Sequence, residues 1–546
     1  MMIISLLFKL ISLRAKIRAA ESITALTLFL CASLQVSAQE TCQTEVLQIP
    51  AGPVCGMLDD TRSPLNIEVF RGMPYAQSVT GENRWTAPKP RPKWTSTLVA
   101  SRFGSACAQS GFYGPGSEEC LFINVWRPKD VSSHEKLSVM VFIHGGGFYS
   151  GSSSDPLYDG ARLASKNVIF ISFNYRLGAL GFLTTASSRG SNYGLLDQQL
   201  ALRWVQDNVG AFGGDPARVT LVGESAGAIS IGLHLTAMPE SKKLFSGAIM
   251  ESNLLGVPLR NLSDEIGVSD LFTAMAGCSD VQCLKNMNVK DLVEASDKFR
   301  AQAGLVLKDH LASVNVWGPI IDDQAVRLPP LPVAQDTPQK PVLIGFNQYE
   351  GALFVAPFAG QPASFYPEWL YSLFGKNMKS IMRAYPLVTA NPVDPAAQVF
   401  TDYVFDCSSA NFASGFAQAY RYEFTHQPSF KMLPLKECNN KACHTTELPF
   451  VFGNAELLVL PTGEKAKFTA DEIQLSDSMQ RYWTNFAKTG NPSSGTDVPV
   501  AWPLASATKS GVLKLAWPIV AGPSSGGRQC EMWNKIGYPP TGNVSQ

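Results

Sequence analysis

Charged residues are scarce in this sequence of 546 residues: they make up 16% of it, and 45 Lys and Arg residues balance 45 Asp and Glu residues. Low charge together with 10% aromatic residues excludes an intrinsically disordered chain. The absence of a positive excess argues against nucleic acid as a partner. The 44 glycines and 36 prolines follow no fixed period, which excludes collagen-like and solenoid architectures. We therefore expect a large globular protein with an extensive core.

The sequence also lacks the ligand spacings of common metal sites. It contains neither paired CxxC motifs nor an HExxH motif. Cys438, Cys443 and His444 lie close together in the sequence but form no recognised metal-binding pattern. We expect neither a metal nor an organic cofactor.

Residues 1–38 have the features of a signal peptide. A basic region precedes an apolar stretch, Ile23–Leu34, and the small residues at 36–38 favour cleavage before Gln39. A retained anchor is the alternative, but the apolar stretch is short for a spanning helix, which needs roughly 20 residues. No later stretch is apolar enough to cross a membrane. We expect a secreted or periplasmic protein whose mature chain has a net charge near −3.

The cysteine count agrees with export. Once Cys31 is removed with the signal peptide, ten cysteines remain, an even number that suits an oxidising compartment. Spacing favours the pairs Cys42–Cys55, Cys107–Cys120, Cys278–Cys283 and Cys438–Cys443, which leaves Cys407 for Cys530. Spacing alone leaves other connectivities open.

Apolar, β-branched runs alternate with helical stretches along the chain. The expected strands are Val139–His144, Val168–Tyr175, Val219–Gly223, Ser246–Met250, Val342–Phe346 and Ala419–Phe424. Helices are expected between some of them, at Leu196–Asn208 and Ala226–Leu235. This alternation predicts an α/β fold with a mostly parallel sheet covered on both faces. We expect one domain, residues 39–546, with large and mainly helical insertions at 253–341 and 352–416.

The segment Gly223–Gly227 reads Gly-Glu-Ser-Ala-Gly and stands between an expected strand and an expected helix. A GxSxG sequence in this context forms a sharp turn that exposes the serine hydroxyl above the sheet. The positive end of the following helix favours a developing anion there. We therefore predict that Ser225 is a nucleophile.

A glycine run follows the expected strand that begins at Val139. In His144–Phe148 three consecutive glycines leave backbone N–H groups uncovered, so that a substrate can approach the chain closely. We expect Gly146 and Gly147, together with the N–H of Ala226, to stabilise an oxyanion. Removal of one such donor costs about 3 kcal/mol of transition-state stabilisation.

A nucleophilic serine needs a base, and the sequence has six histidines: His134, His144, His234, His310, His426 and His444. In sheets of this kind the chain order is serine, acid, histidine. His134 and His144 precede the serine, His234 lies on the helix directly after it, and His310 precedes the expected acid. His426 closes a strand, where a packed or surface role is expected. His444, in the loop that follows, is the predicted base.

The acid should follow another strand at the same edge of the sheet. Glu350 does so, three residues after the run that ends in Phe346-Asn347. Its expected role is to hold the histidine in the correct tautomer and to stabilise the imidazolium. Three other carboxylates compete on composition but do not directly follow such a strand: Asp322, Asp323 and Asp402.

A series of ordered motifs between Phe70 and Trp533 resembles the type-B carboxylesterase family, which includes cholinesterases, para-nitrobenzyl esterases and fungal lipases. The motifs are Phe70–Ala76, Ser117–Val125, His144–Phe148, Asn174–Leu177, Asn192–Gln198, Phe212–Pro216, Gly223–Gly227, Glu350–Gly351 and Phe450–Gly453. The resemblance implies an α/β-hydrolase fold and the triad Ser225, Glu350 and His444. It also implies the disulfides Cys107–Cys120, Cys278–Cys283 and Cys407–Cys530.

The sequence departs from cholinesterases in the loop Ala108–Glu119. In cholinesterases this loop is long and carries a tryptophan that stacks on choline, whereas here it is short and its aromatic residues are Phe112 and Tyr113. A quaternary ammonium needs an aromatic face. We therefore expect uncharged short- to medium-chain esters as small-molecule substrates. A lipase for longer chains and a non-catalytic adhesion protein are the alternatives; the complete triad disfavours adhesion.

Overall fold

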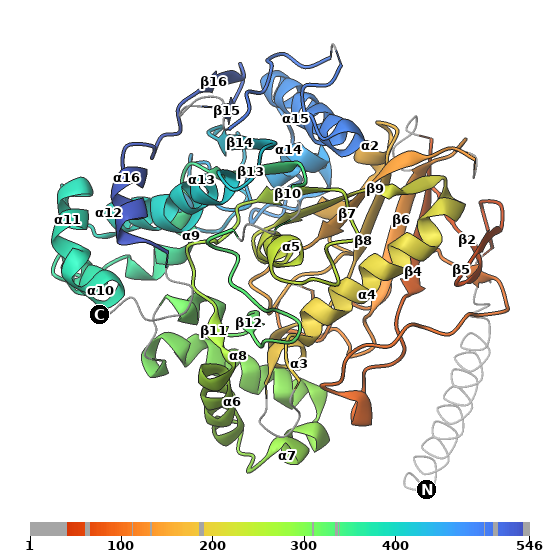
Figure 1. Ribbon diagram of the computed structural model, residues 1–546, viewed down its shortest axis with the longest axis horizontal. Helices are drawn as coiled ribbons and strands as arrows, with labels where there is room; N and C mark the ends of the chain where they lie inside the picture. The colour runs from red at the N-terminus through yellow and green to blue at the C-terminus, as the bar shows by residue number, and fades with distance from the viewer. Residues whose placement is uncertain are drawn as a thin grey trace, which may run out of the picture. The chain divides into compact units, whose positions relative to one another are not determined.

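An eleven-stranded sheet lies at the centre of the computed structural model, in the order β16-β15-β14-β13-β10-β9-β7-β8-β6-β4-β3 (Figure 1). In that order the strands are Val520–Gly522, Val512–Leu515, Ala419–Phe424, Val342–Asn347, Gly247–Glu251, Gly214–Glu224, Leu137–Ile143, Ile169–Phe173, Phe122–Pro128, Ile67–Pro74 and Met57–Leu58. All neighbours from β15 to β8 pair in parallel. The predicted mostly parallel sheet is confirmed, and antiparallel strands extend both of its edges.

The structure describes residues 41–59, 66–111, 113–131, 134–184, 190–307, 311–333, 337, 339–495, 497–505 and 511–538. The expected signal peptide, residues 1–38, lies outside these ranges, and so do Phe112 and His310. In the part of the chain that is described, no helix is both long enough and apolar enough to span a membrane.

Helices cover both faces of the sheet. The larger ones are α4 (Tyr193–Asn208), α5 (Ala226–Thr236), α6 (Leu262–Met275), α8 (Val289–Val306), α10 (Phe365–Phe374), α12 (Val393–Phe400) and α15 (Ala470–Thr489). The shorter ones are α2 (Ala161–Ala164), α3 (Gly178–Phe182), α7 (Val281–Asn286), α9 (Gly351–Val355), α11 (Met378–Ala384), α13 (Cys407–Ala413), α14 (Leu448–Phe452) and α16 (Cys530–Ile536). Both predicted insertions are mainly helical: α6 to α8 lie in the first and α9 to α13 in the second.

Two smaller sheets complete the fold. One consists of β1 (Leu47–Ile49), β2 (Gly52–Cys55) and β5 (Leu98–Val99), and the other pairs β11 (Arg260–Asn261) with β12 (Ile320–Ile321).

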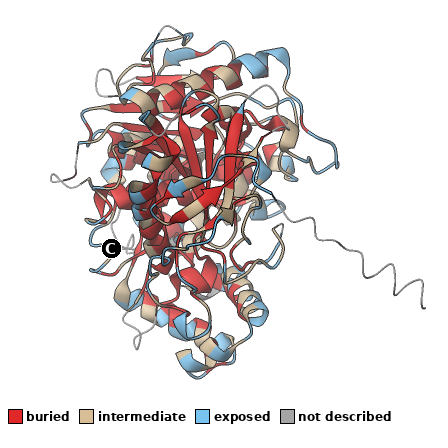
Figure 2. Cartoon of the chain, turned by 90° about the vertical axis from the view of Figure 1, so that its right-hand side faces the viewer, coloured by how far each residue is buried: buried red, intermediate tan, exposed pale blue. Residues whose placement is uncertain are grey.

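Side chains alternate between two cores because successive residues of a strand point to opposite faces. In β7, Val139, Val141 and Ile143 join the core that includes α4 and α5. Met140 and Phe142 join the other core, which includes residues of α15 such as Trp483. Figure 2 shows the central strands buried on both faces. Burial on both sides explains why these strands read as continuous apolar runs in the sequence.

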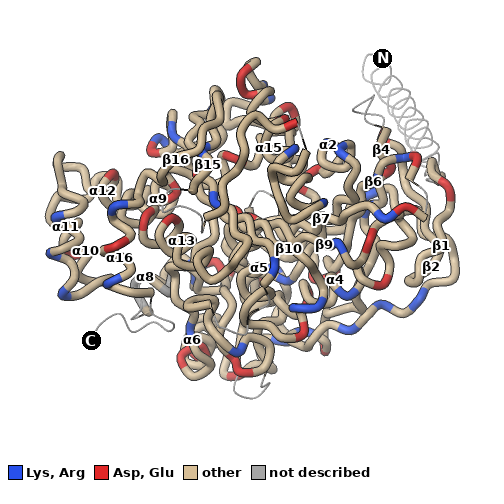
Figure 3. Tube along the Cα trace, turned by 45° about the horizontal axis from the view of Figure 1, so that its top comes forward, with Lys and Arg blue, Asp and Glu red and all other residues tan. Residues whose placement is uncertain are grey.

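The structure joins ten cysteines in five disulfides. They are Cys42–Cys55, Cys107–Cys120, Cys278–Cys283, Cys407–Cys530 and Cys438–Cys443, the same pairs that spacing favours. Basic and acidic residues are interspersed along the trace (Figure 3).

Candidate active site

The turn at Ser225 joins the end of β9 to the start of α5. Ser225 has φ 55° and ψ −120°, a strained conformation that L-residues rarely adopt. The turn needs glycine at position 227 because a Cβ there would lie 2.0 Å from the carbonyl oxygen of Ile143. The Ser225 N–H donates to the carbonyl oxygen of Glu251 at 2.9 Å, which fixes the turn to the end of β10.

The structure brings Ser225, His444 and Glu350 together, although they are far apart in the sequence. The Ser225 hydroxyl lies 3.0 Å from Nε2 of His444, and Nδ1 of His444 lies 2.6 Å from Oε2 of Glu350. All three side chains are buried, and Ser225 is the most exposed at 7%. Because a carboxylate only accepts hydrogen bonds, Nδ1 carries the proton and Nε2 is free to accept one from the serine.

Glu350 is held in place at the carboxyl end of β13. Its Oε1 accepts hydrogen bonds from the backbone N–H of Asn347 at 2.7 Å and from the hydroxyl of Ser252 at 2.5 Å. Ser252 follows β10, just as Ser225 follows β9. The carboxyl ends of parallel strands meet at one edge of a sheet, so this topology gathers the side chains that follow them.

The ring of His444 packs between aromatic side chains. Its centroid lies 5.2 Å from the ring of Phe354 on α9 and 5.7 Å from the ring of Phe405. Phe405 belongs to a π-helical segment, Thr401–Asp406, that connects α12 to α13. These contacts, together with the bond to Glu350, restrict rotation of the imidazole.

The glycine run that follows β7 lies directly against the serine. A Cβ on Gly145 would come within 3.2 Å of the Ser225 Cβ. Gly146 has φ +104°, which few other residues tolerate. Among the described residues, the N–H groups of Gly146, Gly147 and Ala226 have no hydrogen-bond acceptor. The three predicted oxyanion donors are therefore uncommitted and close to the serine.

Three further buried carboxylates surround the triad: Glu224, Glu251 and Glu447. Burial raises the pKa of each, because a charged carboxylate is poorly solvated there. Mutual repulsion raises their pKa values further: Glu447 acts on Glu251 and Glu224, and Glu350 acts on Glu447. The cluster therefore holds protons at pH values where an exposed carboxylate has none.

Glu224 is the carboxylate that faces the reactive nitrogen of His444. Its Oε1 lies 3.1 Å from Nε2, about as close as the serine hydroxyl. Burial alone lowers the pKa of His444, but the charges of Glu224 and Glu350 outweigh burial and raise this pKa above its ordinary value. When Glu224 takes up a proton, one of these two charges disappears, and the neutral imidazole that can act as a base becomes more stable.

The sequence interpretation missed three members of this network: Ser252, Asn347 and Glu447. Asn347 donates its side-chain N–H to Oε2 of Glu447 at 2.5 Å, and Glu447 stands three residues after His444. Ser252 could have been identified from the sequence, because it is a polar residue directly after a buried strand, β10. Glu447 had no comparable signal, because its role depends on tertiary packing.

The other described histidines lie outside the triad. Burial lowers the pKa of His144 to about 4 and that of His234 to about 3, so both are neutral. His426 packs against Phe450, and its Nε2 lies 3.1 Å from Oε1 of Glu472. His134 is exposed.

The competing acids lie elsewhere too. Asp322 follows β12, which is outside the central sheet, and accepts hydrogen bonds from Ser191 and Asn192. Asp323 is exposed next to it. Asp402 accepts a hydrogen bond from the hydroxyl of Tyr385 at 2.7 Å.

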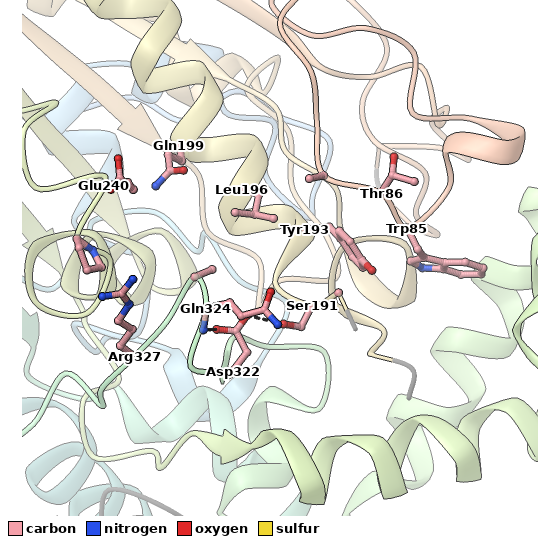
Figure 4. Close-up of a pocket in the computed structure, with 14 residues that line it drawn as sticks. Trp85, Thr86, Ser191, Tyr193, Leu196, Gln199, Glu240, Asp322, Gln324 and Arg327 are labelled. Atoms are coloured by element: carbon pink, nitrogen blue, oxygen red, sulfur yellow. Dashed lines mark hydrogen bonds between the residues drawn. The ribbon is translucent and has the colours of Figure 1, made fainter. Parts of the chain in front are cut away.

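A cavity of about 530 Å³ lies beside α4 and is lined by none of the triad residues (Figure 4). Trp85, Tyr193, Asp322 and Arg327 contribute to its wall. Gly190 also lines it, and the preceding residues 185–189 lie outside the described ranges. We assign no ligand to this cavity.

Within the described ranges, one group of residues has the proximity needed for a metal ion: Asp406, Cys407 and Cys530. The two sulfurs of this group are joined in a disulfide, so they are not available as thiolate ligands.

Comparisons with known proteins identify relatives of this chain. Residues 43–533 match the model of a family described as "Carboxylesterase family". The cAMP-regulated D2 protein of Dictyostelium discoideum is 34% identical over 491 residues, which cover 86% of this chain and 88% of that protein. The para-nitrobenzyl esterase of Bacillus subtilis (strain 168) is 36% identical over 460 residues, which cover 80% and 88%. A solved PNB esterase structure, 33% identical, superposes with a TM-score of 0.75 and covers 89% of this chain and 99% of its own.

Proposed function

This chain belongs to the carboxylesterase family, and from that premise we propose that it hydrolyses esters through an acyl-enzyme formed on Ser225. The α/β-hydrolase fold and carboxylesterase activity follow from the family match and from relatives that are themselves esterases. The observation that carries the mechanism is the continuous chain of hydrogen bonds from Ser225 through His444 to Glu350.

In the first half-reaction His444 removes the proton from Ser225 as its oxygen attacks the ester carbonyl. The N–H groups of Gly146, Gly147 and Ala226 donate to the oxyanion that forms. The tetrahedral intermediate collapses, His444 gives its proton to the departing alkoxide, and the alcohol leaves the acyl group on Ser225. In the second half-reaction His444 activates a water molecule, which releases the carboxylic acid and restores the serine.

Glu350 stabilises the imidazolium that forms at each step, and its hydrogen bond to Nδ1 keeps Nε2 directed at the serine. Glu224 lies 3.1 Å from the same Nε2, and its charge adds to that of Glu350 in raising the pKa of His444 and stabilising the imidazolium.

The substrates we propose are uncharged esters with short or medium acyl chains. The described part of the loop between Cys107 and Cys120 offers no tryptophan face to a quaternary ammonium. Of two tryptophans outside this loop, Trp85 is buried with the guanidinium of Arg84 5.8 Å from its ring centroid, and Trp94 donates its ring N–H to the carbonyl oxygen of Pro53. The Bacillus subtilis relative is named for an uncharged para-nitrobenzyl ester, which supports this choice.

We further propose that residues 1–38 are a signal peptide and that residues 39–546 form the exported domain. Five disulfides support an oxidising destination, because cytosolic thiols keep most cysteines reduced.

The variant Ser225→Ala tests the mechanism. Its hydrolysis of p-nitrophenyl butyrate should fall to the background rate, while its far-UV circular dichroism should match that of the wild type, because the hydroxyl contributes little to packing. Normal turnover by the folded variant would eliminate Ser225 as the nucleophile.

A pair of matched esters tests the substrate class. Butyrylcholine and its uncharged isostere 3,3-dimethylbutyl butyrate differ in charge and hardly in shape, and we expect the isostere to have the higher kcat/KM. A preference for choline of tenfold or more, about 1.4 kcal/mol of transition-state binding, would demonstrate a cation site.

A further inference from the structure

The disulfide Cys438–Cys443 ends one residue before the proposed catalytic base. Cys443 is fully buried and is followed directly by His444, while Cys438 closes the 3₁₀ turn Lys436–Cys438. The bond spans a sequence separation of only five residues, with the two Cα atoms 5.5 Å apart. It therefore constrains the backbone immediately before the imidazole.

The same short loop is attached to the strand end that carries the proposed acid. The N–H of Tyr349 donates to the carbonyl oxygen of Ala442 at 2.8 Å, and Tyr349 pairs with Cys443 in an isolated parallel bridge. The residue before the acid is thus paired with the residue before the base. The distance between Glu350 and His444 depends on this pairing.

Lys441 adds a second attachment. Its ammonium lies 4.8 Å from the ring centroid of Tyr349 and 3.1 Å from Oδ1 of Asp394 on α12. Asp394 is largely exposed, so the ion pair is screened by solvent and contributes less than a buried contact.

The backbone around His444 is strained and has no regular secondary structure to hold it. Asn440 has φ 55° and Thr445 has φ 74°, and a β-branched residue rarely adopts positive φ. Several hydrogen bonds of this loop are local, such as those from Lys441 to Cys438 and from Cys443 to Lys441. Such strain persists only where the surroundings enforce it.

We propose that the Cys438–Cys443 disulfide is the positioning element of the catalytic histidine, so that His444 meets Glu350 and Ser225 productively only when this bond is closed. The inference rests on the proposed function of these three residues. Closure joins the two thiols and transfers two electrons and two protons to a small-molecule disulfide, which becomes two thiols. Cytosolic thiols keep such pairs open, so the bond couples esterase activity to an oxidising compartment.

The Cys278–Cys283 disulfide is a matched control within the same chain. It has the same sequence separation of five residues and the same Cα–Cα distance of 5.5 Å. It joins Cys278, which follows α6, to Cys283 within α7 in the first helical insertion, and no described hydrogen bond or ring contact joins it to a triad residue. Equal loops give equal chain-entropy contributions to stability. A difference in kcat between variants that lack one or the other disulfide is therefore due to where the disulfide lies in the structure.

The test compares the full-length double variants Cys438→Ser/Cys443→Ser and Cys278→Ser/Cys283→Ser with the wild type. For p-nitrophenyl butyrate we expect the first variant to lose tenfold or more in kcat with KM changed less than twofold. The second should keep kcat within twofold. Equal kcat in the two variants, or an unchanged kcat in the first, would overturn the inference. Ser225→Ala separates the two proposals, because its inactivity is expected whether or not the disulfide positions His444.

Partial reduction of the folded wild type provides a second measurement if the first variant does not fold. Dithiothreitol is titrated, free thiols are alkylated, and mass spectrometry locates them. Loss of activity should follow alkylation of Cys438 and Cys443 and be independent of the opening of Cys278–Cys283, and oxidised glutathione should restore activity before alkylation. Full activity in molecules whose Cys438–Cys443 bond is open would contradict the proposal.

Discussion

His444 and His234 are both enclosed by the protein, yet their pKa values are shifted in opposite directions. His444 lies among carboxylates: Glu350 at Nδ1 and Glu224 at Nε2, at 2.6 and 3.1 Å. These charges raise its pKa although burial lowers it. Nothing offsets burial at His234, and its pKa falls to about 3.

The neighbours of His234 are neutral. Its Nε2 lies 3.0 Å from Oε1 of Gln198 on α4, and its Nδ1 lies 2.8 Å from the hydroxyl of Ser241. Gln198 also donates to the hydroxyl of Ser230, which donates to the carbonyl oxygen of Ala226. This network joins α4 to the first turn of α5, where Ala226, a proposed oxyanion donor, lies. Charged neighbours therefore allow a buried histidine to take up a proton, whereas neutral neighbours leave it a neutral hydrogen-bonding group that joins two helices.

Substitution of each histidine in turn tests most directly whether His444 is catalytic and His234 structural. His444→Gln should lower kcat for p-nitrophenyl butyrate by about 10⁴- to 10⁶-fold, the usual cost of removing the base of a triad. His234→Gln should keep kcat within about tenfold, because glutamine can still make hydrogen bonds at that position. Comparable losses in both variants would refute the division into a catalytic and a structural histidine.

The dependence of stability on pH distinguishes the two environments further. The pKa of His234 is about 3 in the folded protein and 6.5 in its ordinary state, so the unfolded chain binds a proton first as the pH falls. His234 therefore costs stability between pH 6.5 and about 3, at a rate of at most about 1.4 kcal/mol per pH unit.

Urea unfolding of the wild type and of His234→Gln between pH 7 and pH 4.5 measures this cost. The wild type should lose stability faster than the variant as the pH falls. Parallel curves would show that His234 is not held neutral.

The smallest expected effect concerns Glu224. Glu224→Gln keeps the shape of the protonated carboxyl but removes a charge that raises the pKa of His444. The acid limb of the kcat/KM profile should therefore move to lower pH. Asp402→Asn is the control, because burial and Asp406 raise the pKa of Asp402 to about 7 while Asp402 is not among the charges that shift the pKa of His444. An acid limb that moves upward, or moves equally in the control, would contradict the assigned role of Glu224.

Much of the fold could be predicted because buried parallel strands have a distinctive sequence. The expected strand Ala419–Phe424 has the bounds of β14, and the expected helix Ala226–Leu235 is one residue shorter than α5. The serine turn was also recognisable from the sequence, because a strand and a helix that meet so closely need glycines at the turn.

The antiparallel strands at the edges were not predicted. β3 has two residues and β16 has three, too few to show a periodic pattern, whereas β4 with eight and β6 with seven residues were long enough to show one. The carboxylate network was also missed. Glu224 is far from His444 in the sequence and approaches it through tertiary packing, and Glu447, although only three residues after His444, accepts its hydrogen bond from the distant Asn347. Local sequence does not encode this packing.

The most direct test of the account is the identity of the serine that becomes covalently modified. The purified protein is treated with an organophosphate, and the adduct is located by mass spectrometry in the wild type and in His444→Gln. The account predicts one rapid adduct, on Ser225, in the wild type and a strongly slowed reaction in the variant. A rapid adduct on any other serine, or equal labelling rates in the two proteins, would contradict it.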